Sequence, residues 1–246
     1  MDRAIAAGAQ FIVSPGFNPK VVAYCNEKGI TVTPGCACPS DMERAIEAGL
    51  KVVKFFPAEQ AGGLEYIKAV AAPYTALRFM PTGGINAANI NKYLAFEKIV
   101  ACGGSWMVPG KLLDEGSFEE ITRLCREAVQ TVMGFELMHI GINAENEAEA
   151  EKAARWFETL FAFAVRPTAG SIFAGTGIEV MKSPYLGKNG HIAIGVNSIR
   201  RAVAYLERLG METAPGTEKT DAKGKLVAVY LKEEVAGFAV HLLQKK

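Results

Sequence analysis

The chain has 246 residues, of which half are hydrophobic and 22% are charged, with a formal net charge of +1. That length suits one large domain or two ordinary ones, and the composition is typical of a globular protein. Because there is no long basic or acidic block, we expect neither a nucleic acid nor a membrane surface as partner.

The amino-terminal residues lack the apolar core of a secretory signal, and the cysteines number five. An odd number of cysteines in mostly apolar sequence predicts reduced thiols and a cytoplasmic location. Cys36 and Cys38 could form a redox or metal pair, but the sequence offers no second pair to complete a site.

Residues 1–133 alternate short β-branched runs with helical segments. The predicted strands are 11–14, 30–34, 51–57, 77–82 and 98–104. The segments between them begin with Asn, Pro, Ser or Asp, which are helix-start signals, and the first two end in Gly. A repeat of about 20 residues per strand and helix predicts parallel βα units. Five such units precede a long closing helix over 117–133.

Residues 51–59 read KVVKFFPAE and place a lysine, Lys54, in the middle of an apolar strand. Lys54 shares a face with Phe56, and both faces are otherwise apolar, as in a parallel strand covered on both sides. Burial would favour the neutral amine, which can attack a carbonyl and form a Schiff base. The alternative is a structural lysine paired with a carboxylate such as Glu59.

Two glycine pairs follow the next two strands, in PTGGIN (81–86) and GGSW (103–106). Glycine permits close backbone approach, and helix starts offer free amides to an anion. Either pair alone could be an ordinary turn. Together, downstream of an interior lysine, they predict a phosphorylated carbonyl substrate.

These residues resemble the 2-keto-3-deoxy-6-phosphogluconate / 4-hydroxy-2-oxoglutarate aldolases. The resemblance rests on AGAQF (7–11), SPG (14–16), TPG (33–35), VKFFPAE (53–59), FMPTGGI (79–85) and GGSW (103–106). It implies that Lys54 is the Schiff-base lysine of a class I aldolase, a carbon–carbon lyase that needs no cofactor. It also implies that Phe56 lines the pocket and that the phosphate-binding residues are Thr82, Gly83, Gly84, Gly104 and Ser105. The keto acid partner would be cleaved to pyruvate and an aldehyde, and the family implies a homo-oligomer, often a trimer.

Five βα units cannot close an eight-stranded barrel. In the family the barrel begins three strands earlier, and those strands carry the glutamate acid/base and further substrate-binding residues. We therefore expect a truncated (β/α) barrel over 1–133 with impaired turnover. An open five-stranded α/β sheet, or a partner chain that supplies strands, are the alternatives.

Residues 134–246 contain an internal repeat. HIGIN (139–143) and HIAIGV (191–196) each precede a helix and further strands, and their histidines are 52 positions apart. In each strand the aliphatic side chains lie on one face, with a polar residue among small ones on the other. We expect an α+β domain of two βαβββ modules with the aliphatic faces toward the helices.

This repeat resembles the vicinal oxygen chelate, or glyoxalase-like, superfamily. The resemblance implies four metal ligands, His139, Glu179, His191 and His241, for Zn²⁺, Fe²⁺, Ni²⁺ or Mn²⁺. Histidine at position 241 departs from the glutamate often found there, and an empty solvated cup is the alternative. The expected function is therefore the aldolase, and the alternative is a metal-dependent glyoxalase-like enzyme or small-ligand binding module that carries an inactive barrel remnant.

Overall fold

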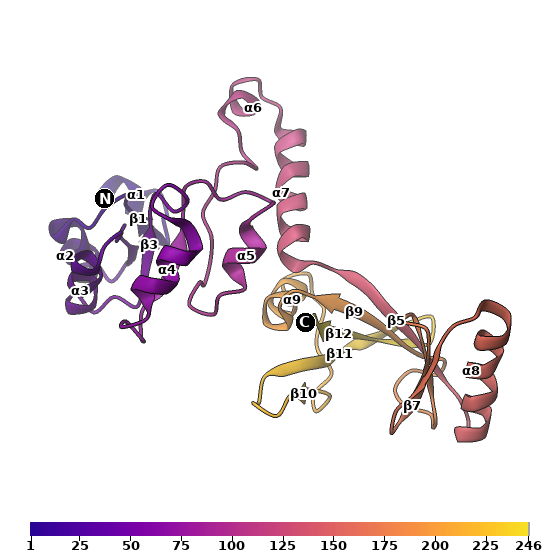
Figure 1. The fold of residues 1–246 in the computed structure, drawn as a ribbon. Coiled ribbons are helices and arrows are strands. Elements are labelled where there is room, and N and C mark those ends of the chain that lie inside the picture. Colours follow the sequence, from indigo (N-terminus) through magenta and orange to yellow (C-terminus); the bar gives the residue numbers. More distant parts are fainter. Residues whose placement is uncertain (246) are drawn as a thin grey trace. The chain divides into compact units, whose positions relative to one another are not determined.

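The computed structural model describes residues 1–245, which divide into two compact units, Met1–Thr131 and a second unit that begins at Val132 (Figure 1). Among the described residues, none of the helices combines the length and the hydropathy needed to cross a membrane.

The first unit alternates helices with short parallel strands. Its strands are β1 (Phe11–Val13), β2 (Thr31–Thr33), β3 (Val52–Phe55) and β4 (Arg78–Pro81). Its helices are α1 (Asp2–Ala6), α2 (Pro19–Glu27), α3 (Pro39–Glu47), α4 (Gly63–Ala71), α5 (Ile90–Leu94), α6 (Gly110–Asp114) and most of α7 (Phe118–Met133). β1 pairs with β2 and β3 with β4, and a bridge between Gly35 and Lys54 joins the two pairs. Neighbours in the sequence are thus parallel neighbours in space.

Helix starts follow the expected local chemistry. The Asn18 side chain accepts hydrogen bonds from the backbone N–H groups of Lys20 and Val21, and Pro19 is the first residue of α2. An asparagine cap satisfies amides that have no partner inside the helix, and proline has no amide to satisfy. This fixes where α2 leaves the carboxyl edge of β1.

The fifth predicted strand, 98–104, is not a strand in the structure. It contributes only two isolated parallel bridges, Phe79 with Ile99 and Thr82 with Gly103. The bridges differ in register by one residue, and Pro81 lies between them. Proline has no N–H to donate to the next position of the ladder, so the pairing is interrupted there.

β3 is buried on one face only. Val53 and Phe55 are fully buried, whereas Lys54 is half-buried and Phe56 is 37% exposed. The prediction of a strand covered on both faces is therefore wrong for this structure. Phe11 and Val13 of β1 are also exposed, so the less covered face extends beyond β3.

The second unit is built on one eight-stranded mixed sheet. Its strands are β5 (Glu136–Asn143), β6 (Val165–Pro167), β7 (Ser171–Ala174), β8 (Ile178–Met181), β9 (Gly190–Val196), β10 (Lys219–Thr220), β11 (Leu226–Val235) and β12 (Phe238–Gln244). Two helices, α8 (Glu147–Phe161) and α9 (Ile199–Glu207), follow β5 and β9. The order strand, helix, three strands thus occurs twice. The sheet order is β10-β11-β12-β9-β5-β8-β7-β6, which places the repeated β5 and β9 side by side at the centre.

The aliphatic faces of these strands pack on the helices, as the alternation predicts. Val180 and Ile172 form a cluster with two alanines of α8. Val229 and Leu242 form another cluster with Ile199 at the start of α9. The opposite sheet face remains for polar side chains, and the three histidines lie there.

Candidate functional site

The lysine site lies where β3 and β4 end. Lys54 pairs in register with Met80 of β4, and its backbone also bonds to Pro34 and Cys36 on the other side. The Lys54 Nζ atom lies 4.6 Å from the centre of the Phe56 ring. The Lys54 amine therefore lies near the Phe56 ring, on the less covered face of the sheet.

The loop after β4 is joined to the segment after β3. The N–H of Ala58 donates to the Thr82 carbonyl at 2.8 Å, and the N–H of Glu59 donates to the Gly83 carbonyl at 3.1 Å. The bridge between Thr82 and Gly103 brings the second glycine loop alongside. The structure thus brings the segment after β3 and the two glycine loops side by side: Phe56, Thr82, Gly83 and Gly84 lie there, Gly104 and Ser105 directly follow the bridged Gly103, and Lys54 lies on β3 two residues before Phe56.

Backbone donors are available at this edge. The backbone N–H groups of Gly84 and Ser105 donate no hydrogen bond to any described residue, and both residues are exposed. Gly83 and Gly84 have φ angles of +99° and +78°. Only glycine adopts such angles readily, so the conformation of this loop depends on both residues.

Glu59 has a different partner from the one considered in the sequence. It accepts a hydrogen bond from the hydroxyl of Tyr93 on α5. Among the described residues, no carboxylate lies within ion-pair distance of Lys54. The alternative of a structural Lys54–Glu59 pair is therefore wrong for this structure.

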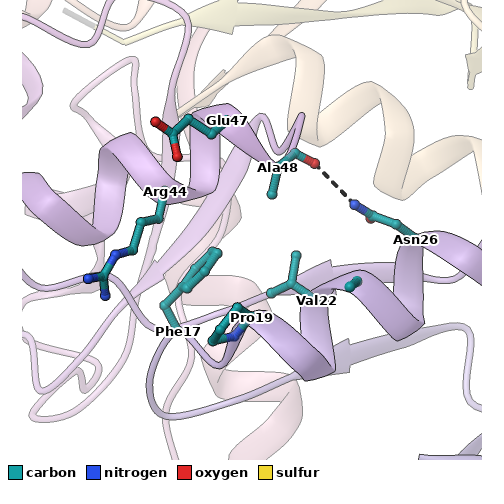
Figure 2. A pocket seen from close by; sticks show the side chains of 8 residues that line it. Phe17, Pro19, Val22, Asn26, Arg44, Glu47 and Ala48 are labelled. Atoms are coloured by element: carbon teal, nitrogen blue, oxygen red, sulfur yellow. Dashed lines mark hydrogen bonds between the residues drawn. The ribbon is translucent and has the colours of Figure 1, made fainter.

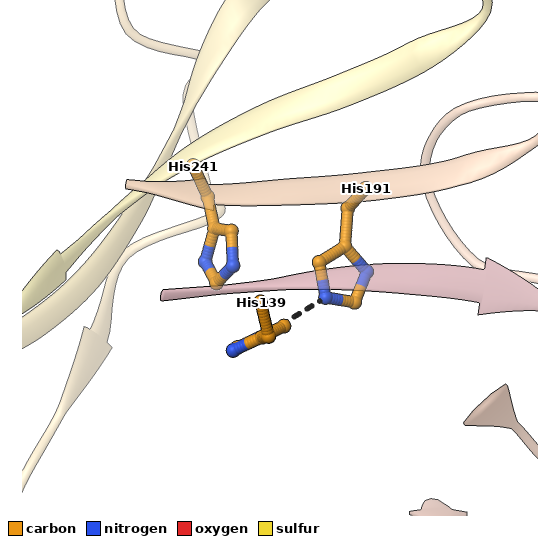
Figure 3. A group of neighbouring side chains, drawn as sticks. All are labelled: His139, His191 and His241. Atoms are coloured by element: carbon orange, nitrogen blue, oxygen red, sulfur yellow. Dashed lines mark hydrogen bonds between the residues drawn. The ribbon is translucent and has the colours of Figure 1, made fainter. Parts of the chain in front are cut away.

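The three histidines of the second unit come together on the sheet face opposite the helices (Figure 3), and Glu179, the fourth predicted metal ligand, lies within hydrogen-bond distance of two of them. His139 Nε2 lies 3.1 Å from His191 Nε2 and 3.0 Å from Glu179 Oε2, and His191 Nε2 lies 3.2 Å from the same oxygen. Ligand atoms of all three histidines lie within 4.8 Å of one another. The four side chains come from β5, β8, β9 and β12, which are adjacent strands.

The histidines are almost completely buried, with exposures of 9% for His139, 3% for His191 and 7% for His241. Three of their nitrogens, His191 Nδ1 and both nitrogens of His241, have no hydrogen-bond partner among the described residues. A buried polar atom without a partner is costly and calls for an explanation.

The electrostatics keep Glu179 ionised and His241 neutral. Burial raises the pKa of Glu179, but hydrogen bonds from His139, His191 and Ser171 outweigh burial and hold that pKa well below its usual range. Burial, with the neighbouring His191 and His139, lowers the pKa of His241 to about 3. At neutral pH the cluster therefore combines a carboxylate with a neutral imidazole, in which one ring nitrogen has a free lone pair.

Two further residues contact this cluster, and neither was predicted from the sequence. Ser171 Oγ donates to Glu179 Oε1 at 2.6 Å. The Tyr230 ring stacks on His241 with centroids 4.7 Å apart. Burial, followed by the charges of Tyr185 and Glu179, raises the pKa of Tyr230 to about 12, so its hydroxyl stays protonated.

A separate hollow of about 650 Å³ lies between α2 and α3 (Figure 2). Its rim is closed by a hydrogen bond from Asn26 Nδ2 to the Ala48 carbonyl at 3.1 Å. Arg44 and Glu47 are its charged residues. None of the predicted site residues lines it, so it is not part of the lysine site.

Comparison with known proteins concerns mainly the first unit. The family model described as KDPG and KHG aldolase matches residues 1–124. The 2-dehydro-3-deoxy-phosphogluconate aldolase of Treponema pallidum (strain Nichols) is 52% identical over 131 residues, covering 53% of this chain and 62% of the relative. The KHG/KDPG aldolase of Escherichia coli (strain K12) is 44% identical over 124 residues, covering 50% of this chain and 58% of the relative. The chain thus spans less than two thirds of the length of these relatives.

A solved structure of a methylmalonyl-CoA epimerase is also similar to part of the chain. It is 14% identical, with a TM-score of 0.34, and the match covers 46% of this chain and 97% of that one.

Proposed function

Because the chain belongs to the KDPG and KHG aldolase family, we propose that its first unit carries class I aldolase chemistry on a 2-keto-4-hydroxy acid. The observation that supports this best is the shared edge, where Lys54 of β3 lies next to two glycine loops with free amides.

Lys54 acts as the nucleophile. Its amine attacks the keto carbon, water leaves, and a protonated Schiff base forms. When the 4-hydroxyl loses its proton, the bond between carbons 3 and 4 breaks and its electron pair moves toward the iminium nitrogen. The aldehyde departs, the enamine takes up a proton, and hydrolysis releases pyruvate and restores Lys54. The Phe56 ring over Nζ limits access of water to one side of the amine.

The glycine loops bind the far end of the substrate. Gly84 and Ser105 present backbone N–H groups, and the Thr82 backbone is bridged to Gly103 beside them, with its hydroxyl donating to the Met80 carbonyl at 3.5 Å. Such groups suit a phosphate, whose oxygens accept several hydrogen bonds at once. We therefore infer a phosphorylated aldehyde as the second product.

Covalent trapping tests the role of Lys54. After incubation with pyruvate and borohydride, intact-mass spectrometry should show one adduct that is absent from Lys54→Ala. Lys51→Ala is the matched control, because Lys51 is an exposed lysine three residues earlier in the same chain segment. An adduct that persists in Lys54→Ala, or no adduct on the unmodified chain, would refute the assignment.

We propose a second function for the second unit, a divalent metal site in a glyoxalase-like domain. Ligand bonds of about 2.1 Å in a tetrahedral site place the ligand atoms roughly 3.4 Å apart. His139 Nε2, His191 Nε2 and Glu179 Oε2 lie at mutual distances of 3.0–3.2 Å. In the metal-free cluster two imidazole N–H groups can share this one carboxylate oxygen, whereas a single cation can bond to all three atoms at once.

The four predicted ligands fit a divalent metal ion. Three imidazoles and one carboxylate suit Zn²⁺, Fe²⁺, Ni²⁺ or Mn²⁺, and His241 offers nitrogens that have no other partner. When bound, the metal would supply Lewis acidity toward a ligand with adjacent oxygens. Glu179 is held in place for this by Ser171.

Metal content tests the second proposal. After equilibration with Zn²⁺ and removal of excess metal, elemental analysis should find one ion per chain. Replacing both His139 and His191 by Ala should remove it, whereas Glu158→Gln, a change at an exposed carboxylate of α8, should not. Equal zinc content in all three proteins would refute the site.

A further inference from the structure

We propose that Tyr93 and Glu59 form a positioning pair, which holds the 82–84 loop in the conformation that binds the phosphate group. The inference rests on the proposed aldolase function and assigns roles to two residues that do not contact the reacting atoms.

Tyr93 fixes the side chain of Glu59. Tyr93 lies on α5 and is 1% exposed, and its hydroxyl donates to Glu59 Oε1. A buried hydroxyl that loses its acceptor costs free energy, so the hydrogen bond strongly favours one orientation of the Glu59 side chain. Both atoms also lie close to Gly63, where a Cβ would be 3.3 Å from the Tyr93 hydroxyl. The hydrogen bond therefore joins a buried hydroxyl to an exposed residue, Glu59, beside the backbone of Gly63.

Glu59 in turn contacts the loop with its backbone and its side chain. Its N–H donates to the Gly83 carbonyl at 3.1 Å. A Cβ built on Gly84 would lie 2.6 Å from both Cβ and Cγ of Glu59, so the stem of Glu59 packs directly against Gly84. A change in the Glu59 side chain would therefore alter the packing of the 82–84 loop.

These contacts orient the amides. In a planar trans peptide the C=O and the following N–H point in opposite directions. Because the Gly83 carbonyl points to Glu59, the N–H of Gly84 points away from it. The Gly84 carbonyl accepts hydrogen bonds from the Asn86 and Asn89 side chains at 3.3 and 3.0 Å, which turns the N–H of Ile85 away from them. The loop is thus held from two sides, which fixes the directions of the Gly84 and Ile85 N–H groups.

The hydrogen bond from Tyr93 needs only an acceptor oxygen at the Glu59 side chain and does not need its negative charge. Glutamine offers the same acceptor without the charge. Glu59→Gln should therefore preserve phosphate binding, whereas Glu59→Ala should not.

The experiment measures phosphate binding and lysine reactivity on the same full-length proteins. Inorganic phosphate is titrated and followed by phosphorus NMR, and pyruvate is trapped at Lys54 with borohydride. The variants are Tyr93→Phe, Glu59→Ala and Glu59→Gln. Tyr74→Phe is the matched control, because the Tyr74 hydroxyl also bonds to a glutamate, Glu43, at a site away from the loop.

We expect Tyr93→Phe and Glu59→Ala to weaken phosphate binding about tenfold, which corresponds to about 1.4 kcal/mol. Glu59→Gln and Tyr74→Phe should bind phosphate like the unmodified chain, and all variants should trap pyruvate equally. The inference is overturned if Tyr93→Phe binds phosphate normally, if trapping falls in parallel, if Glu59→Gln fails to rescue, or if the unmodified chain binds no phosphate. Absence of a pyruvate adduct on the unmodified chain would instead refute the aldolase role of Lys54.

Discussion

Replacing Gly141 by alanine should disable the proposed metal site without changing a ligand. Gly141 lies on β5, and a Cβ built there would be 2.1 Å from His191 Cε1, 2.3 Å from Nδ1 and 2.4 Å from Nε2. Ordinary contact begins at 3.4 Å, so the His191 ring or the strand must move by about 1.3 Å (3.4 minus 2.1). Metal–ligand distances tolerate only about 0.2 Å.

We therefore expect Gly141→Ala to weaken zinc binding by about 100-fold or more, the upper range seen when the support of a metal ligand is lost. The assay is isothermal titration of the metal-free protein with Zn²⁺. Gly177→Ala is the matched control, because a Cβ there meets nothing within 4 Å. Zinc affinity in Gly141→Ala equal to that of Gly177→Ala would refute the reasoning that His191 occupies the space above this glycine as a ligand.

Three further predictions concern stability. The pKa of His241 is lowered to about 3 in the folded chain, so the stability that this shift contributes is present above the unfolded pKa of about 6.5 and declines as pH falls. Urea unfolding in EDTA should therefore show that the free energy of unfolding decreases by about 2 kcal/mol between pH 8 and pH 5. A free energy of unfolding that does not change over this range would contradict the prediction. Phe55→Ala removes a fully buried ring of β3 and should cost about 3–5 kcal/mol in the free energy of unfolding of the first unit, measured by urea titration. Gly35→Ala would place a Cβ 1.9 Å from the Pro15 carbonyl oxygen, a backbone atom, and should lower that unfolding free energy by about 1–3 kcal/mol; an unchanged urea midpoint would speak against it.

The site edge of the first unit was predictable because parallel strands end at the same side of a sheet. Lys54 lies on β3, Thr82 follows β4 and Gly104 ends the segment 98–104 that bridges to β4, so βα units in sequence order bring these three segments side by side. The failure of the fifth strand depends on a single residue, Pro81, which interrupts the ladder. The Tyr93–Glu59 bond joins residues 34 positions apart through a helix, and no periodicity signals such a pair.

The histidine face of the second unit was predictable for a similar reason, since residues at alternate positions share a face. Tyr230 was not. Counting back from the hairpin pair Val235 and Phe238 would place Lys232 opposite His241, but an irregularity between Tyr230 and Glu234 shifts the register by two residues. A bulge of this kind leaves little trace in the sequence, yet it decides which side chain packs on the metal ligand.

The ligands of the proposed metal site are divided equally between the two halves of the repeat. His139 and Glu179 belong to the first half, His191 and His241 to the second, and the halves meet where β5 pairs with β9. Neither half alone holds more than two donors, so affinity exists only while the halves are docked. By linkage, an ion that binds this arrangement strengthens the docking by the same free energy. The pairing of β5 with β9 would then be the part of the fold that metal binding stabilises most. Hydrogen exchange of the amides in these two strands would report directly whether the metal site is occupied.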